Sequence, residues 1–249
     1  MKIKTIYIDD KDEELEKYKR KFERNDLSKD RFEIITINAQ RKPKDLLNEI
    51  EKHNPELILV DFDLTIPKDS VLIGISGVAL STTLRENFPD IPIVLFTRKS
   101  LFKIEKYSPM EQVLSSLDEI VYKGDVFKSD EKNLDFLYGL AVGFKELREE
   151  RSKKWVDLLK IIKAPEDDYN DLKLSNPPIT SKGKWSVSKA VKWIRNTLIK
   201  YPGILYDPLH SATFLGISKD AFLSEPIQKF FSKAKYSGIF APSLKSSAD

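Results

Sequence analysis

Five short runs of apolar, largely β-branched residues alternate with longer amphipathic stretches through the first half of the chain, and this alternation constrains the fold most strongly. The runs are "IKTIYI" (3–8), "FEIITIN" (32–38), "LILV" (57–60), "IPIVLFT" (91–97) and "EIVYK" (119–123). Helical spacing covers about Asp12 to Arg24, 44–53, 76–87 and 109–117 between them. The unbroken apolarity of the third and fourth runs indicates strands that are buried on both faces. The sequence therefore predicts an α/β fold, a doubly wound five-stranded parallel sheet with helices on both faces.

A long helical stretch follows the fifth run. No proline or other stop signal interrupts it between Asn133 and Lys163, so we expect a long fifth helix that covers the sheet and continues as a connector. A dimer seam along this helix is an alternative interpretation. Residues 163–184 are rich in Pro, Asn, Asp and Ser, which is typical of a linker. The predicted domains are 1–130 (the strand–helix core), 131–163 (the long helix) and 164–249 (a small, mainly α-helical C-terminal domain).

The composition excludes several classes of site and of location. The chain has 249 residues, two histidines and no cysteine, which excludes disulfides and thiolate metal sites and fits a reducing compartment. No apolar run approaches the ~20 residues that a membrane-spanning helix needs. The first residues lead directly into a predicted strand without a signal-peptide pattern. We therefore expect a cytoplasmic protein with no membrane partner.

Polar residues gather where the predicted strands end. Asp9 and Asp10 follow the first strand, Asp61 follows the third, and Thr97 and Lys123 end the fourth and fifth. Ligands of such sheets bind at the carboxyl ends of the strands, where these side chains converge. Carboxylates suit a hard cation such as Mg²⁺, and a hydroxyl with an ammonium suits the oxygens of a phosphoryl group. The set predicts a phosphoryl-transfer centre built on an aspartate.

The segments that carry these residues resemble the receiver domain of two-component response regulators. They are "IYIDDK", "NPELILVD", "SGVALSTTLRENFPDIPIVLFT" and "DEIVYKGD", in the order and spacing of that family. The resemblance implies the strand order 2-1-3-4-5 and phosphoryl acceptance on Asp61 from a histidine kinase or a phosphotransfer protein. It also implies that Asp9, Asp10 and Asp61 bind Mg²⁺. By the same resemblance Lys123 contacts the phosphoryl group and Thr97 is the switch hydroxyl.

Asp63 competes with Asp61 for the role of acceptor. The family usually has a proline four residues after its acceptor, but here that position is Thr65 and the proline is Pro67. Counting back from Pro67 nominates Asp63, whereas counting forward through "NPELILVD" nominates Asp61. We favour Asp61, because the length of the buried strand fixes which side chain reaches the sheet edge, whereas loops tolerate insertions.

Further departures from the family are expected to tune the site. Asp63 and Lys99 occupy the variable positions two residues after the acceptor and two residues after the switch threonine, and their opposite charges suggest an ion pair over the site. Arg98 replaces a small residue of the family and is expected to narrow the access of phosphodonors. Ile120 stands where the family has its switch aromatic residue.

The leading hypothesis is a non-enzymatic response regulator, in which Mg²⁺-dependent phosphoryl acceptance on Asp61 switches a helical output or interaction module. A homodimer through the region of the fourth and fifth helices is a further expectation. Residues 164–249 contain the amphipathic stretch "KAVKWIRNTLIK" but no convincing basic recognition helix, so DNA is not the favoured partner. Two alternatives stay open: a phosphorylation-independent scaffold that keeps the receiver fold, and a transcription regulator with an unrecognised DNA-binding domain.

Overall fold

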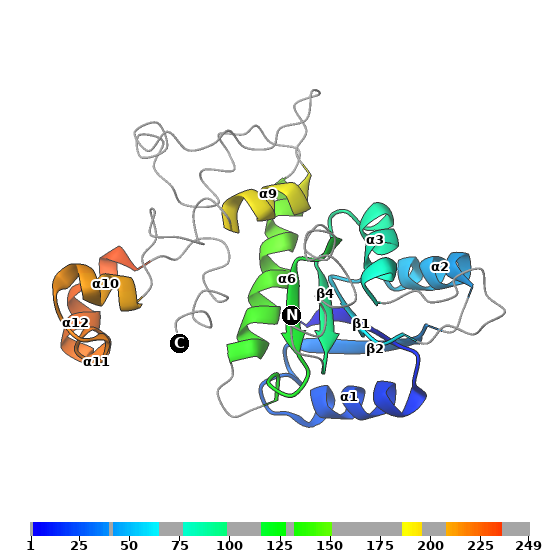
Figure 1. Cartoon of the computed structure of the whole chain (residues 1–249), viewed down its shortest axis with the longest axis horizontal. Helices are drawn as coiled ribbons and strands as arrows, with labels where there is room; N and C mark the ends of the chain where they lie inside the picture. The colour runs from blue at the N-terminus through cyan, green and yellow to red at the C-terminus, as the bar shows by residue number, and fades with distance from the viewer. Residues whose placement is uncertain are drawn as a thin grey trace.

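The centre of the molecule is a five-stranded parallel sheet with the strand order β2-β1-β3-β4-β5 (Figure 1). The structure is a computed structural model that describes residues 2–39, 42–64, 77–98, 116–127, 132–150, 186–195 and 208–235. The strands are β1 (Ile3–Asp9), β2 (Phe32–Asn38), β3 (Leu57–Val60), β4 (Ile93–Thr97) and β5 (Glu119–Tyr122). All neighbouring strands pair in parallel, so the predicted sheet and its order are confirmed.

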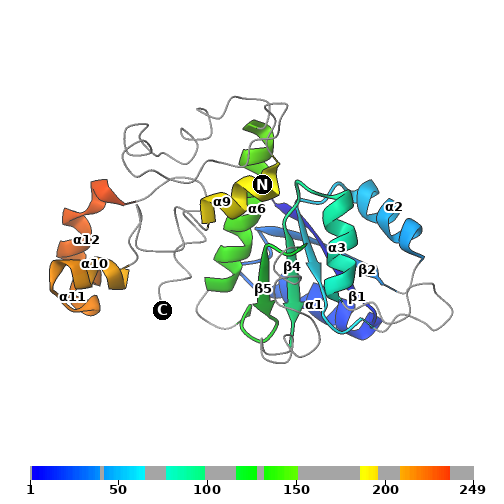
Figure 2. The same ribbon diagram turned by 45° about the horizontal axis from the view of Figure 1, so that its top comes forward.

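Helices cover both faces of this sheet, and each face has its own core. The helices that pack on it are α1 (Asp12–Arg24), α2 (Pro43–His53), α3 (Gly77–Asn87) and α6 (Lys132–Glu150). One core contains side chains of α1 and α6, and the other contains side chains of α2 and α3 (Figure 2). Successive residues of a strand point to opposite faces, so Leu59 joins the first core while Ile58 and Val60 join the second. This division explains why the central strands are apolar without interruption.

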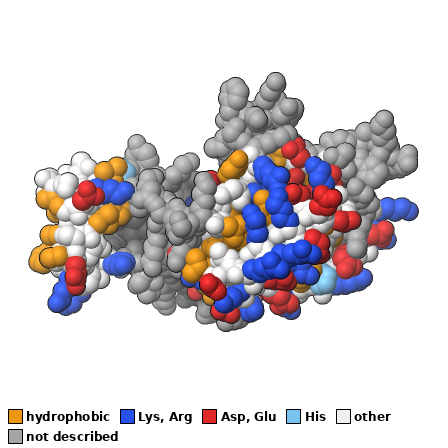
Figure 3. All heavy atoms as spheres, turned by 90° about the horizontal axis from the view of Figure 1, so that it is seen from below, with side chains coloured by type: hydrophobic (Ala, Val, Ile, Leu, Met, Phe, Trp, Pro, Cys, Tyr) orange, Lys and Arg blue, Asp and Glu red, His pale blue; other side chains and the backbone are white. Residues whose placement is uncertain are grey.

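α1 shows how the sequence fixes the position of a helix beside the sheet edge. Its buried residues Leu15, Tyr18 and Phe22 recur at helical spacing on one side. Acidic residues occupy its first turn and basic residues its last turn, as the helix dipole favours. Figure 3 shows Lys and Arg side chains beside Asp and Glu over the surface that includes the outer side of α1. The apolar side of α1 therefore packs on the sheet, while its charged residues lie on the outer side.

Among the described residues of the C-terminal part, one helix packs into the core of the sheet. In α9 (Val187–Ile194), the residues Val187, Ala190, Val191, Trp193 and Ile194 are buried in the same cluster as α1 and α6. Figures 1 and 2 both show α9 lying against α6. α9 lies within 164–249, the predicted C-terminal domain, and it packs on the sheet-covering helix α6. The predicted domain division stays a prediction.

The remaining described helices form a small group of their own. They are α10 (Pro208–Leu215), α11 (Lys219–Leu223), α12 (Glu225–Phe230) and the short 3-10 helix η2 (Ser232–Ala234). The predicted mainly helical character of the C-terminal part is confirmed for the residues that the structure describes. The predicted helix at 109–117, apart from its last two residues, and the continuation of the long helix beyond Glu150 lie outside the described residues. In the described ranges no helix has the length and apolarity to span a membrane.

Candidate functional site

The sequence-predicted polar residues occupy the carboxyl edge of the sheet. Asp9 and Thr97 are the last residues of β1 and β4, and Asp10, Asp61 and Lys123 directly follow β1, β3 and β5. The ladder of backbone hydrogen bonds extends past β3 and β5: the N–H of Asp61 donates to the carbonyl of Ile8 at 2.9 Å, and that of Lys123 donates to the carbonyl of Thr97 at 2.7 Å. All five side chains are buried. The register therefore brings the predicted residues to one edge.

The ammonium of Lys123 contacts two of the acidic side chains at this edge, those of Asp9 and Asp61. Its Nζ lies 2.6 Å from Oδ1 of Asp61 and 3.0 Å from Oδ2 of Asp9. β1 and β3 are neighbours in the sheet, and the lysine reaches them from the far side of β4. Charge-assisted bonds of this length are among the stronger hydrogen bonds in proteins. A cation is thus held directly beside the expected acceptor.

Gly77, at the start of α3, packs closely against the backbone of Asp61. Its N–H donates to the carbonyl of Phe62 at 2.9 Å, which holds the start of α3 against the end of β3. A Cβ atom at this position would lie 1.8 Å from the carbonyl oxygen of Asp61, closer than any side chain can approach. Only glycine therefore permits this contact.

Burial and nearby charges shift the pKa values of Asp61 and Asp9 in opposite directions. Burial raises the pKa of Asp61, and the nearby Lys123 only partly offsets this effect. Burial also acts to raise the pKa of Asp9, but the hydrogen bond from Tyr7 and the charge of Lys123 outweigh it and lower that pKa overall. Asp9 is therefore held as an anion, whereas Asp61 is the more basic carboxylate. A more basic carboxylate is the better nucleophile of the two.

The two candidate acceptors have different surroundings. Asp61 is buried and contacts Lys123, while Asp63 is exposed and its backbone N–H donates to Oδ2 of Asp61 at 2.9 Å. The residues that made the assignment ambiguous, Thr65 and Pro67, lie outside the described residues. These contacts favour Asp61, and the assignment stays a prediction.

Arg98 is exposed and reaches from the end of β4 to α1. Its guanidinium forms an ion pair with Glu14 and lies 6.0 Å from the centre of the Tyr18 ring. Burial acts to raise the pKa of Glu14, but Lys17 and Arg98 together lower it. The expected effect of Arg98 on phosphodonor access stays a prediction. Lys99, and with it the expected pair with Asp63, lies outside the described residues.

One polar residue of the site was not predicted from the sequence. Tyr7 is buried in β1, its hydroxyl donates to Oδ2 of Asp9, and it accepts a hydrogen bond from Nζ of Lys123 at 2.7 Å. Burial, followed by the charge of Asp9, raises the pKa of this hydroxyl, so it stays neutral. Strand alternation could have found it, because Tyr7 and Asp9 are two residues apart and point to the same face.

Asp9, Asp10 and Asp61 are the candidate ligands for Mg²⁺ at this edge. Within the described ranges, no group of three or more Asp, Glu, His or Cys side chains is arranged to hold a metal ion. Mg²⁺, however, commonly keeps several waters and binds one or two carboxylates together with phosphate oxygens. Asp10 and Asp61 present carboxylate oxygens at the edge, whereas Oδ2 of Asp9 is already engaged by Tyr7 and Lys123. Oδ1 of Asp61 contacts Lys123 and its Oδ2 accepts from the backbone N–H of Asp63, but each of these two oxygens has a second lone pair. The residues fit Mg²⁺ with few protein ligands, and coordination by Asp9, Asp10 and Asp61 together stays a prediction.

The chain has the strand order β2-β1-β3-β4-β5 with buried polar residues at its carboxyl edge, and solved structures of response-regulator receiver domains are similar to part of it. The isolated REC domain of RcsB from Salmonella enterica serovar Typhimurium matches with 19% identity and a TM-score of 0.41, over 55% of this chain and 88% of that chain. The response regulator TrrA from Thermotoga maritima, solved with Mg²⁺ and BeF, matches with 23% identity and a TM-score of 0.39, over 55% and 99%. A signal receiver domain from Pseudomonas fluorescens matches with 14% identity and a TM-score of 0.43, over 59% and 93%. No family model and no curated protein matches the sequence.

Proposed function

We propose that the chain is a response regulator that accepts a phosphoryl group on Asp61. One observation carries this proposal: the Lys123 ammonium lies 2.6 Å from Oδ1 of Asp61, at the edge of the sheet where ligands of such folds bind. A cation in this place offsets the charge that the transferred group brings. The proposed donor is a histidine kinase or a phosphotransfer protein that carries phosphohistidine.

In the proposed transfer, a carboxylate oxygen of Asp61 attacks the phosphorus atom of the donor. The new P–O bond forms as the P–N bond breaks, the electron pair leaves with the imidazole, and the imidazole takes a proton from water. The product is an acyl phosphate on Asp61. Lys123 then exchanges its bond to Asp61 for one to a phosphoryl oxygen, and Thr97 supplies a hydroxyl beside it. Mg²⁺, when held by Asp10 and Asp61, would neutralise further charge on the phosphoryl oxygens.

The proposed output runs through β5 to α9. Lys123 follows the carboxyl end of β5, and Glu119 begins the strand at its amino end. Glu119 forms an ion pair with Arg195, the residue that caps α9, at 2.5 Å. One short strand, β5, therefore connects Lys123 to the ion pair between Glu119 and Arg195 at the end of α9. We propose α9 as the first element of the output module.

Mass spectrometry tests the proposal directly. The full chain is incubated with Mg²⁺ and a small phosphodonor such as acetyl phosphate, and we expect a phosphoryl mass increment that Asp61→Asn abolishes. Asp63→Asn is the matched control, because it removes a carboxylate two residues away and should retain the increment. Loss of the increment in Asp63→Asn alone would move the acceptor to Asp63. No increment in the unmodified chain, together with no binding of beryllofluoride, would overturn the proposal.

A phosphorylation-independent scaffold is the second candidate, and one observation favours it. Ile120 packs half-buried against the core of α2 and α3, so this position of β5 presents no aromatic ring that could respond to Thr97. In a scaffold, Asp61→Asn would leave the binding of a partner protein unchanged. The DNA-binding alternative stays a prediction, and strongly salt-dependent DNA binding by the full chain would support it.

A further inference from the structure

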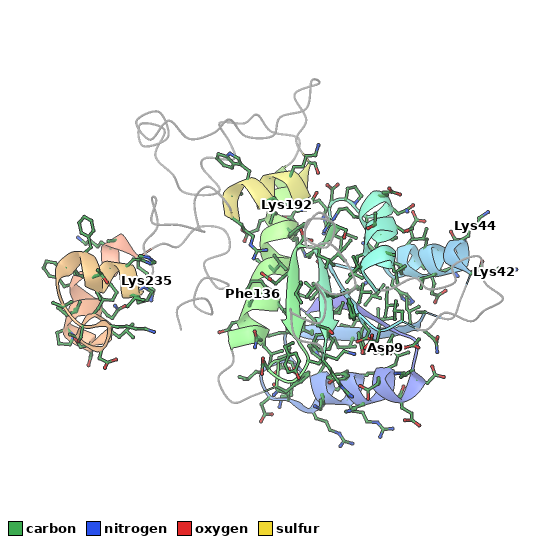
Figure 4. The ribbon with its side chains drawn as sticks, viewed as in Figure 1. Asp9, Lys42, Lys44, Phe136, Lys192 and Lys235 are labelled. Carbon is green, nitrogen blue, oxygen red and sulfur yellow. The ribbon has the colours of Figure 1, made fainter. Side chains whose placement is uncertain are left out.

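The hydroxyl of Tyr7 closes a three-membered network inside the site. It donates to Oδ2 of Asp9 and accepts from Nζ of Lys123 at 2.7 Å, while Lys123 itself lies 3.0 Å from the same Oδ2. Asp9 lies on the side of α1 in Figure 4, and the backbone N–H of Lys11 donates to its Oδ1 at 3.1 Å. The position of the Lys123 ammonium is therefore defined by the hydroxyl of Tyr7 as well as by the carboxylates of Asp9 and Asp61.

These contacts use the full capacity of the lysine. An ammonium has three N–H donors, and three oxygens surround the Nζ of Lys123: those of Tyr7, Asp9 and Asp61. Contact with a phosphoryl group on Asp61 requires the bond to Asp61 to be exchanged. The bonds to Tyr7 and Asp9 can stay, so they determine where the ammonium stands during the exchange.

The ring of Tyr7 has little freedom to move. It meets the rings of Tyr18 and Phe96 edge to face, with centroid distances of 5.9 and 5.6 Å. Nζ of Lys123 lies 5.1 Å from the centres of the Tyr7 and Tyr18 rings and 5.6 Å from that of Phe96. Desolvated cation–π contacts of this kind favour a fixed ammonium. The aromatic cluster thus holds both the hydroxyl and the charge that it binds.

We propose that Tyr7 is a positioning residue for phosphoryl transfer, whose hydroxyl fixes the ammonium of Lys123 between Asp9 and Asp61. The role in transfer rests on the proposed function of Asp61. The positioning of Lys123 does not, because the contacts exist in the protein alone. A fixed ammonium needs no reorganisation when charge develops on the phosphoryl oxygens, which is how such groups lower a barrier.

The first arm of the test observes Lys123 without metal or phosphodonor. In the full chain labelled with ¹⁵N-lysine, we expect one ammonium signal that exchanges slowly with water and that disappears in Lys123→Ala. Tyr7→Phe keeps the ring but removes the hydroxyl, and should speed this exchange by at least about tenfold. Tyr18→Phe is the matched control, because it makes the same change in the adjacent ring, whose hydroxyl interacts with Arg98, and should leave the exchange unchanged.

The second arm measures the rate of phosphorylation by acetyl phosphate with Mg²⁺. Tyr7→Phe should slow it by about tenfold, the loss expected for one hydrogen bond to a charged group. The same substitution in a Lys123→Ala background should cause no further loss, since Tyr7 acts through Lys123. Equal losses in both backgrounds would contradict the positioning role.

The outcomes separate this inference from the proposed function. If the chain is never phosphorylated but Tyr7→Phe speeds the exchange of the Lys123 ammonium, the positioning by Tyr7 holds and the proposed function fails. If that exchange is unchanged in a folded Tyr7→Phe, the inference is overturned. If the variant does not fold, the unmodified chain gives a second measurement: a slowly exchanging tyrosine hydroxyl proton that Lys123→Ala perturbs. The absence of such a proton would also overturn it.

Discussion

Asp61 and Asp118 are both buried aspartates beside a cation, and they lie at opposite edges of the same sheet. Asp61 follows β3 and contacts Lys123, while Asp118 precedes β5 and forms an ion pair with Arg85. Burial raises the pKa of both carboxyl groups, and in each case the cation acts in the opposite direction. Each aspartate is thus paired with one cation, but the hydrogen bonds that surround the two pairs differ.

The amino-edge pair is tied into the backbone. Oδ2 of Asp118 accepts the N–H of Ile93 at 2.8 Å, and Arg85 donates to the carbonyls of Ser116 and Ile91 at 3.3 and 3.0 Å. A guanidinium is a rigid planar fork that holds such a set of acceptors together. Lys123 instead has a compact ammonium on a flexible side chain. The contacts of this ammonium described above are all to side-chain oxygens of Tyr7, Asp9 and Asp61. The amino edge therefore uses its buried charge to hold strands together, whereas the charge of Lys123 at the carboxyl edge can change partners.

The largest expected effect comes from breaking the amino-edge pair. Arg85→Met leaves the Asp118 carboxylate buried without its cation, so we expect the free energy of unfolding to fall by about 3–5 kcal/mol. Lys123→Met should cost less, about 1–3 kcal/mol, because Asp61 lies nearer to solvent and can take up a proton, although phosphorylation should be slowed. Denaturant titration of both variants measures these values. A larger loss for Lys123→Met than for Arg85→Met would show that the amino-edge pair is not the one that stabilises the fold more.

The exposed pair of Arg20 and Glu16 supplies the control for this experiment. Its atoms are 3.9 Å apart, and both side chains are more than half exposed. Arg20→Met removes a guanidinium from the same kind of pair at the surface, where the cost is about 0–1 kcal/mol. A loss of that small size for Arg85→Met would show that burial of Asp118 does not govern the effect.

The two edges also differ in how much the sequence revealed. The carboxyl edge could be predicted because Asp9, Asp61 and Lys123 each follow a recognisable strand, and parallel strands end together. β3 and β4 in particular could be located because both of their faces are apolar. Asp118 also borders a predicted strand, but its partner Arg85 is 33 residues away on α3, and no local pattern connects them.

Other features could not be predicted for different physical reasons. A buried tyrosine in a strand has the pattern of a core residue, and strand alternation places Tyr7 on the same face as Asp9 without revealing that its hydroxyl bonds Asp9 and Lys123. The apolar stripe of α9 was visible in the sequence, but a stripe does not reveal which surface it packs on. Here it packs into the core that α1 and α6 share. Long-range contacts of this kind depend on the assembled fold.

A smaller effect is expected where α9 joins the amino edge. Arg195 donates to the carbonyl of Asp118 and pairs with Glu119, and its guanidinium lies 5.8 Å from the ring of Phe136. Arg195→Met should cost about 1 kcal/mol, because the pair is partly exposed and the apolar side of α9 remains buried. Hydrogen exchange of residues 187–194 should accelerate by roughly fivefold. Lys189→Met, at an exposed position of the same helix, should leave the exchange unchanged.

The smallest effect concerns Glu56, which precedes β3 at the amino edge. It accepts hydrogen bonds from Lys145 of α6 at 2.7 Å and from the backbone N–H of Lys4 at 3.1 Å. Burial acts to raise the pKa of Glu56, but these bonds outweigh it and hold the pKa below its ordinary value. A carboxyl group with a lowered folded-state pKa stabilises the fold above its unfolded-state pKa, and this stabilisation is lost as the pH falls through the folded-state pKa.

Glu56→Gln should therefore lower the free energy of unfolding by about 0.5 kcal/mol at pH 7, and the deficit relative to the unmodified chain should vanish in acid. Denaturant titrations between pH 7 and about pH 3 measure it, within the range where Glu titrates. Glu16→Gln controls for removing a carboxylate from an exposed pair. If the deficit in the free energy of unfolding is the same at every pH, Glu56 acts through packing and its charge does not stabilise the amino edge.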